Sequence, residues 1–158
     1  MTDPSQDQDV ANWHRRFASE ANNRAWSLSE AKSRSSKEYG EMLDAAHTAA
    51  FHWRTVGTDV HAARADMLLA HVHALLGHGA IAMPYARRSF DWITSRASPD
   101  WEMAFAHAVL ANAASAANEP ALHAHHYARA KDVGSRIDNA EERRIFEATL
   151  ARIPVPRF

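Results

Sequence analysis

The sequence predicts an all-α protein, and three observations lead to this prediction. Alanine, the strongest helix former, supplies much of the 46% of residues that are hydrophobic. Glycine and proline, which interrupt helices, number only 5 and 6 in 158 residues. No stretch alternates apolar β-branched residues with polar ones, as a half-buried strand does. We therefore expect about seven antiparallel helices and no sheet.

The first two expected helices, 9–32 and 36–56, are separated by a polar break. Both carry apolar side chains at the i, i+3 and i+4 spacing of an amphipathic helix. Ser35 is followed three residues later by Glu38, which is the pattern of a capping box. In such a box each side chain satisfies a free backbone amide at the helix start. Residues 1–8 lack apolar anchors, so we expect a flexible N-terminal tail there.

The third and fourth expected helices, 59–76 and 80–96, meet at a break that contains Gly77 and Gly79. Glycine ends helices readily because it adopts positive φ without a steric penalty. A connection this short makes the two helices antiparallel neighbours. Their alanine-rich faces predict close packing of the two backbones.

Strong start signals define the last three expected helices. The segment Ser98-Pro99-Asp100 combines a capping hydroxyl, a proline and a carboxylate at the positive end of the helix dipole, and it opens a helix over 100–117. Pro120 opens a helix that runs to about residue 136. A final helix is expected over about 138–153.

The length and the stop signals together predict the domain organisation. A chain of 158 residues is long enough to bury one core without disulfide or metal staples. Prolines at positions 154 and 156 stop the final helix. We therefore expect a flexible tail at 1–8, one helical domain over 9–153 and a proline-containing tail at 154–158.

Charge and cysteine content narrow the classes of partner. With 18 Lys and Arg against 19 Asp and Glu, the net charge of -1 gives no field to attract nucleic acid or anionic lipid. The absence of cysteine excludes disulfides, thiolate metal sites and a cysteine nucleophile. The polar, acidic start does not resemble a signal peptide, and no apolar run is long enough to span a membrane. We expect a cytoplasmic protein that binds neither nucleic acid nor membrane.

Two of the expected helix pairs share an internal layout. The pair over 59–96 carries Leu69-Ala70, His73, Ala82, Ala86 and Ser89, and the pair over 100–136 carries Leu110-Ala111, Ala114, Ala124, Ala128 and Lys131. These offsets resemble the tetratricopeptide repeat, and residues 123–134 are similar to the second helix of bacterial members with irregular, degenerate repeats. The resemblance implies stacked α-hairpins closed by a capping helix. Where the family has an aromatic residue at its fourth position, this chain has Asp66 in one pair and His107 in the other.

The resemblance also implies a function. Proteins of this kind hold a peptide or partner protein on the concave face that the first helix of each pair builds. Transferred to this chain, the polar residues of that face are Arg24, Arg64, His71 and Asn112. Arg64 is expected to make a bidentate contact with a carboxylate. We therefore expect a protein-binding or peptide-binding module, and a homodimer is the other assembly that we consider.

The histidines suggest an alternative function. The chain has 11 of them, and His47, His71 and His107 each follow an alanine near the middle of an expected helix. If these helices are neighbours, the three imidazoles converge and bind zinc, copper or iron, in a metal-binding protein or a metalloenzyme. No His-Glu-x-x-His motif, nucleophile elbow or glycine-rich phosphate loop accompanies them. The sequence therefore favours a binding protein without a cofactor over an enzyme.

Overall fold

The computed structural model describes residues 4–157, which form seven α-helices and, within that range, no strand. The helices are α1 (Pro4–Glu30), α2 (Ser36–Val56), α3 (Asp59–Leu75), α4 (Gly79–Thr94), α5 (Asp100–Ala116), α6 (Pro120–Gly134) and α7 (Ala140–Leu150). The prediction of an all-α fold is confirmed. The capping box also forms, because the Glu38 amide donates to the Ser35 hydroxyl and the Ser35 amide donates to the Glu38 carboxylate.

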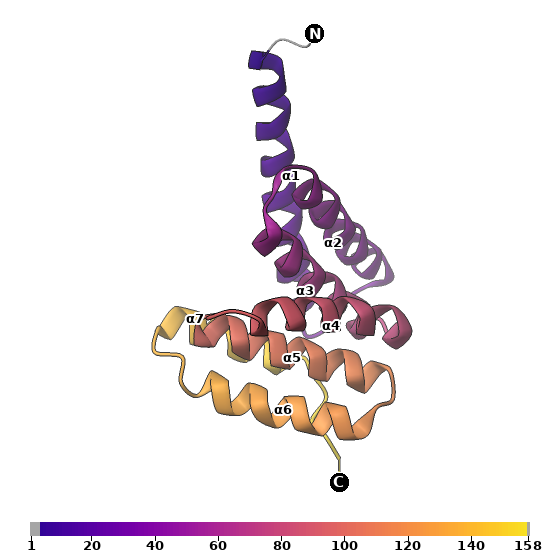
Figure 1. The fold of residues 1–158 in the computed structure, drawn as a ribbon. Helices are drawn as coiled ribbons and strands as arrows, with labels where there is room; N and C mark the ends of the chain where they lie inside the picture. The colour runs from indigo at the N-terminus through magenta and orange to yellow at the C-terminus, as the bar shows by residue number, and fades with distance from the viewer. Residues whose placement is uncertain (1–3, 158) are drawn as a thin grey trace.

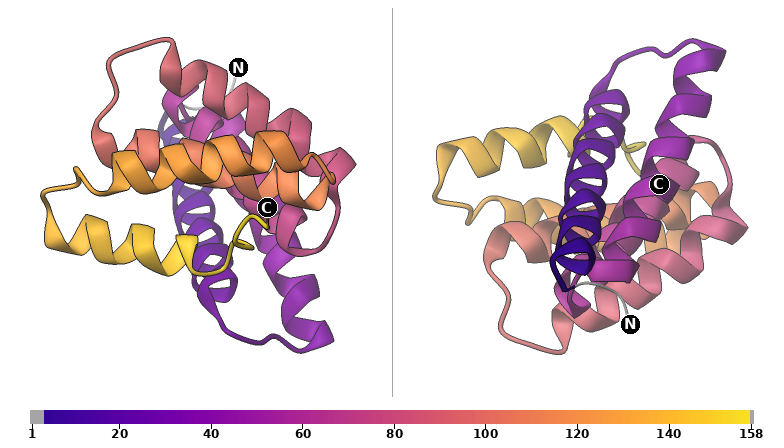
Figure 2. Two further views of the ribbon diagram at one scale, coloured as in Figure 1. Left: turned by 90° about the horizontal axis from the view of Figure 1, so that it is seen from below. Right: turned by 90° about the horizontal axis from the view of Figure 1, so that it is seen from above.

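Consecutive helices pack as antiparallel hairpins, α1 with α2, α3 with α4 and α5 with α6 (Figure 1). The hairpins turn relative to one another along the stack, so that α1 runs steeply across the direction of α5 and α6 (Figure 1). The odd-numbered helices also contact each other in series, and α7 returns to touch α1 (Figure 2). Helices α1, α3, α5 and α7 therefore share one inner face.

The core consists of two apolar clusters that meet along α3. One joins α1, α2 and α3 around Leu68 and Val72, and the other joins α3 through α7 around Val109. Trp26 and Tyr85 pack against both clusters. Each large aliphatic side chain contributes about 1.5–3 kcal/mol on burial, and the intervening alanines let the helices approach closely.

Gly79, the first residue of α4, lies where two hairpins approach each other closely. A Cβ atom at this position would lie 2.4 Å from the backbone of Ala116 and Ala117 at the end of α5. Such a distance is far inside van der Waals contact, so a side chain here would force the helices apart. The preceding Gly77 has a φ of 76°, the conformation in which glycine is favoured.

The N-terminal end of the chain differs from the sequence prediction, and the C-terminal segment contacts α6. Helix α1 begins at Pro4 rather than at residue 9, so residues 4–8 of the expected N-terminal tail are helical, while residues 1–3 lie outside the described part. Proline in the first turn has a preset φ, and Asp7 in that turn favours the positive end of the helix dipole. In the expected C-terminal tail, the carbonyl of Pro154 contacts Nε2 of His123 at 2.8 Å.

None of the helices within residues 4–157 combines the length and the apolar character needed to cross a membrane.

Candidate functional site

The inner face of the stack holds a pocket with a volume of about 330 Å³. Four helices that are distant in sequence contribute to it, since α1, α3, α5 and α7 each supply side chains. The lining residues are Asn22, Trp26 and Glu30 of α1, Arg64 and Met67 of α3, Trp101 and Phe105 of α5, and Glu142 and Ile145 of α7. A single side chain from a ligand fits a space of this size.

Three aromatic rings form the walls of the pocket. The Trp26 and Phe105 rings have centroids 5.8 Å apart and an angle of 82° between their planes. The Trp101 and Phe105 rings are 6.4 Å apart at 77°. Both indoles therefore stand nearly perpendicular to the same buried phenyl ring. We call Trp26, Trp101 and Phe105 the aromatic box.

The charges around the box are arranged so that the pocket is acidic. Arg64 is already neutralised, because its Nε donates to the buried carboxylate of Glu102 at 2.8 Å. Its guanidinium also lies 5.3 Å from the centre of the Trp101 ring. Glu30 and Glu142 line the pocket as well. Together the two pocket carboxylates and the Arg64–Glu102 pair leave an excess of negative charge.

One cation lies near this acidic side. Glu141 raises the pKa of Arg144 chiefly through a hydrogen bond, and Glu30 contributes to the same rise. Arg144 is bonded to Glu141 on the exposed surface of α7, with an Nη2 to Oε1 distance of 2.7 Å. Arg144 therefore interacts with the charge of Glu30 only through space, while its hydrogen bond goes to Glu141 and not to Glu142.

The structure places Arg64 on the pocket but removes His71 and Asn112 from any open surface. Both are buried, and Asn112 Nδ2 lies 3.1 Å from His71 Nδ1. His71 and Asn112 lie seven residues, about two helical turns, after Arg64 and Phe105, so each lies on the same side of its helix as that residue. The Trp26 ring stacks on the His71 ring, with centroids 5.5 Å apart, and covers this side of α3. These two predicted binding residues therefore join α3 to α5 beneath the box rather than line the pocket.

Arg24, another of the predicted binding residues, also lies outside the lining of this pocket. It lies on the side of α1 that faces α2, where its Nε donates to Glu41 at 2.6 Å. Arg24 is two residues from Trp26, which corresponds to about 200° around a helix. When Trp26 faces the pocket, Arg24 therefore points away from it. The sequence signal for the face that lines the pocket was the four-residue spacing of Asn22 with Trp26 and of Trp101 with Phe105.

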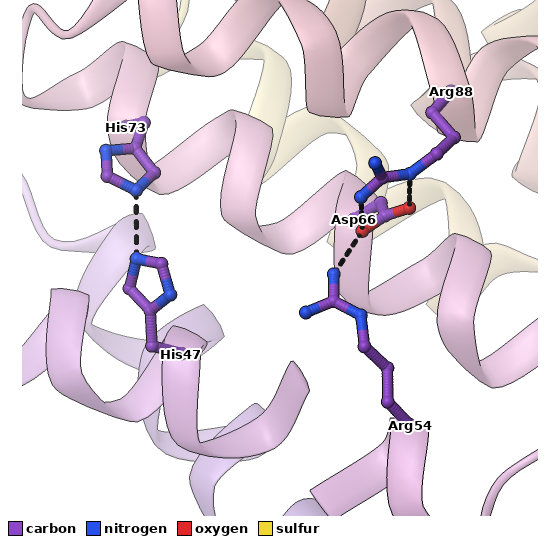
Figure 3. Close-up of polar contacts among 5 residues, drawn as sticks. All are labelled: His47, Arg54, Asp66, His73 and Arg88. Carbon is purple, nitrogen blue, oxygen red and sulfur yellow. Dashed lines mark hydrogen bonds and ion pairs between the residues drawn. The ribbon is translucent and has the colours of Figure 1, made fainter. Parts of the chain in front are cut away.

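The three histidines of the metal hypothesis do not converge. His47 Nε2 lies 3.0 Å from His73 Nε2, as Figure 3 shows. His71 pairs with Asn112, and His107 Nδ1 lies 2.9 Å from His126 Nδ1. Within residues 4–157, no group of three or more His, Cys, Asp or Glu side chains is arranged to hold a metal ion. The site predicted from His47, His71 and His107 is not assembled, because each helix presents its histidine to a different neighbour.

Four histidines are instead neutral parts of the packing. Burial lowers the pKa of four imidazoles to about 4, namely those of His71, His73, His107 and His126. Desolvation is the largest cause in each case. The positive charge of Arg34 adds to it beside His71, and the repulsion that two protonated imidazoles would exert on each other adds to it for His107 beside His126. These side chains act as uncharged hydrogen-bonding groups at neutral pH.

A second polar cluster joins three helices on another face of the protein. The buried carboxylate of Asp66 accepts hydrogen bonds from Arg54 of α2 at 2.7 Å and from Arg88 of α4 at 2.6 and 2.8 Å (Figure 3). Asp66 occupies the fourth position of the repeat, where the tetratricopeptide resemblance implies an aromatic residue. The cluster explains that departure, because an ion-pair network connects α2, α3 and α4 at this position.

In comparisons with protein-family models, curated proteins and solved structures, nothing matched this chain. We therefore infer its function from its geometry and chemistry.

Proposed function

We propose that this protein is a binding module that holds a peptide segment of a partner protein on its inner face, with a basic side chain of that peptide in the aromatic box. The observation that carries the proposal is the box itself, in which Trp26 and Trp101 flank Phe105 beside the carboxylates of Glu30 and Glu142. These side chains recognise a ligand without supplying an activated nucleophile.

A lysine or arginine side chain matches the box in both shape and charge. Its methylene stem packs on the apolar rings, and its charged end is attracted by the ring faces and by the two carboxylates. A cation over an aromatic ring contributes about 0.5–2 kcal/mol, depending on its desolvation. Arg64 illustrates this contact, since its guanidinium lies over Trp101.

The geometry favours a basic anchor over the carboxylate that the sequence suggested for Arg64. A carboxylate would have to displace Glu102, which is buried and already accepts a hydrogen bond from Arg64. It would also meet the like charges of Glu30 and Glu142 in the pocket. Both effects oppose an acidic ligand, so the Arg64–Glu102 pair is best described as a fixed wall of the site.

The proposal is tested by selecting peptides from a random phage-displayed library and measuring their affinities by fluorescence polarisation. The selected peptides should be enriched in lysine or arginine, and Trp101→Leu should weaken them about tenfold, which corresponds to about 1.4 kcal/mol. Glu142→Gln should weaken them about threefold through loss of one charge. Circular dichroism establishes that each variant is folded.

Trp92→Leu is the matched control. Trp92 is also half-buried with an arginine over its ring, but it lies on α4 outside the pocket. Equal affinities for the Trp101→Leu and Trp92→Leu proteins would contradict the assignment of the box. Selected peptides without a basic preference would contradict the proposed anchor.

A further inference from the structure

The N-terminal half of α1 carries an apolar surface that no other helix covers. Val10, Trp13 and Phe17 are 56%, 52% and 45% exposed, and Phe51 on α2 is 63% exposed. We call these four residues the α1–α2 apolar patch. Figure 1 shows that this half of α1 projects beyond the rest of the stack. Grouped exposed side chains of this size mark an interaction surface.

The patch is ordered by its own contacts. The Trp13 and Phe17 rings stack with centroids 5.7 Å apart. The His52 ring lies between the two helices, 5.7 Å from the Phe17 ring and 5.2 Å from the Phe51 ring. His14 Nδ1 and His52 Nδ1 are 2.7 Å apart and connect α1 to α2 beside the patch. A partner therefore meets a preformed surface.

We propose that the α1–α2 apolar patch is the interface of a homodimer, in which α1 packs antiparallel to α1 of a second copy about a twofold axis near Trp13. The i, i+3, i+7 spacing of Val10, Trp13 and Phe17 is that of a coiled-coil seam. An antiparallel pairing places Val10 of each copy opposite Phe17 of the other. The exposed apolar side chains of both copies then cover each other.

The charges beside the seam support a second copy as the occupant. At about 100° per residue, Asp9 and Arg16 lie on the same flank of α1, on the side of the seam opposite His14. In an antiparallel pair related by a twofold axis, identical flanks face each other. When Val10 of one copy lies opposite Phe17 of the other, Asp9 lies opposite residue 18. Arg16 is two residues from that level, which is about 3 Å along the helix axis. Within its own helix Arg16 Nε already donates to Glu20 Oε1 at 2.9 Å, an exposed pair that leaves the other guanidinium donors free to reach Asp9 of the second copy. The twofold axis repeats the contact between Asp9 and Arg16, so the surface is complementary to itself.

The other flank of the seam is equally consistent with this arrangement. It faces α2, which supplies Phe51 at the edge of the patch. The twofold axis places the two copies of α2 on the same side, so their Phe51 side chains extend the apolar interface. The assembly is a four-helix arrangement of α1 and α2 from each copy, and it leaves the pocket on the inner face uncovered by α1 of the partner copy.

Sedimentation of the full chain over about 1 to 200 µM tests the proposal through mass action. The expected species is a dimer of about 35 kDa, twice the 17.6 kDa of the chain. Trp13→Glu should give a monomer at all these concentrations. Ile81→Glu is the matched control, because Ile81 is 49% exposed on α4, outside the patch, and its replacement should leave the dimer intact.

A charge exchange tests the antiparallel register. Asp9→Arg and Arg16→Asp should each weaken dimerisation severalfold, and the double variant should restore it, since the exchanged charges again attract across the twofold axis. A wild-type chain that stays monomeric, or a dimer that persists in Trp13→Glu, would overturn the proposal. Failure of the double variant to restore the dimer would overturn the antiparallel pairing.

Discussion

Acidification should unfold this protein in a pH range set by its buried histidines. His71, His73, His107 and His126 have pKa values lowered from 6.5 to about 4 in the folded state. The unfolded chain therefore takes up protons first as the pH falls. The stability that these neutral imidazoles provide is fully present above about pH 6.5 and is lost progressively towards pH 4.

The expected loss follows from the size of these shifts. A group with pKa values of 6.5 unfolded and about 4 folded loses about 2 kcal/mol of its contribution between pH 7.5 and pH 5. The two imidazoles of the His107–His126 pair titrate separately in the unfolded chain, so each adds a loss of the same sign. His71 alone accounts for about 2 kcal/mol, and with the losses from His73, His107 and His126 the total is a large part of the stability of an ordinary domain, about 5–15 kcal/mol.

Urea unfolding followed by circular dichroism at a series of pH values measures this change on protein without a histidine tag. Hydrogen bonds lower the pKa of Glu38 and Glu141 below 4.5, so most of the pH dependence that these two carboxylates add lies below pH 5. His71→Gln should lower the stability at pH 7.5 but reduce the pH-dependent loss by about 2 kcal/mol, since glutamine does not titrate. A free energy of unfolding that changes by less than about 1 kcal/mol between pH 7.5 and pH 5 would refute the reasoning.

Two further predictions concern the packing of the helices and are checked by the same urea unfolding at neutral pH. Gly79→Ala should destabilise the protein by about 2–3 kcal/mol, because the added Cβ meets the end of α5. Gly40→Ala should stabilise it by about 0.5–1 kcal/mol, because no atom lies within 4 Å of the added Cβ. Similar effects of the two substitutions would contradict the close approach at Gly79. Asp66→Ala should cost about 2 kcal/mol, less than a fully buried ion pair, because Arg54 and Arg88 are half-exposed and regain water. An Asp66→Ala protein as stable as the wild type would show that the cluster does not hold α2, α3 and α4 together.

The helices were largely predictable from the sequence because their signals are local. The capping box of Ser35 and Glu38 starts α2 at the expected residue, and Pro120 starts α6. These features depend on side chains within one turn of the helix end, so no knowledge of the tertiary structure is needed. The start of α1 was misjudged because residues 4–8 are exposed, and their helical structure does not depend on an apolar face.

The site was less predictable because it depends on how the helices rotate and cross. On α3 the predicted Arg64 lines the pocket together with Met67. On α1 the predicted Arg24 lies about half a turn around the helix from Trp26, which is the residue that lines the pocket. Periodicity identifies an apolar stripe but not which neighbour covers it, and here Trp26 covers His71. No sequence pattern connects Trp26 with Trp101 and Phe105, because only the packing of α1, α3, α5 and α7 brings these rings together around a pocket.

Because α7 returns to contact α1, a ligand bound in the pocket would stabilise the first and the last helix of the chain together. In an open stack of hairpins each unit touches only its neighbours, so the two ends can fray independently. Here the pocket takes side chains from both the first and the last helix. The peptide that we propose as the ligand would connect these distant helices, and its binding energy would oppose the detachment of either one. A bound ligand should therefore slow hydrogen exchange in both α1 and α7, which are far apart in sequence. Removal of α7 should abolish binding and leave α3 to α6 stacked.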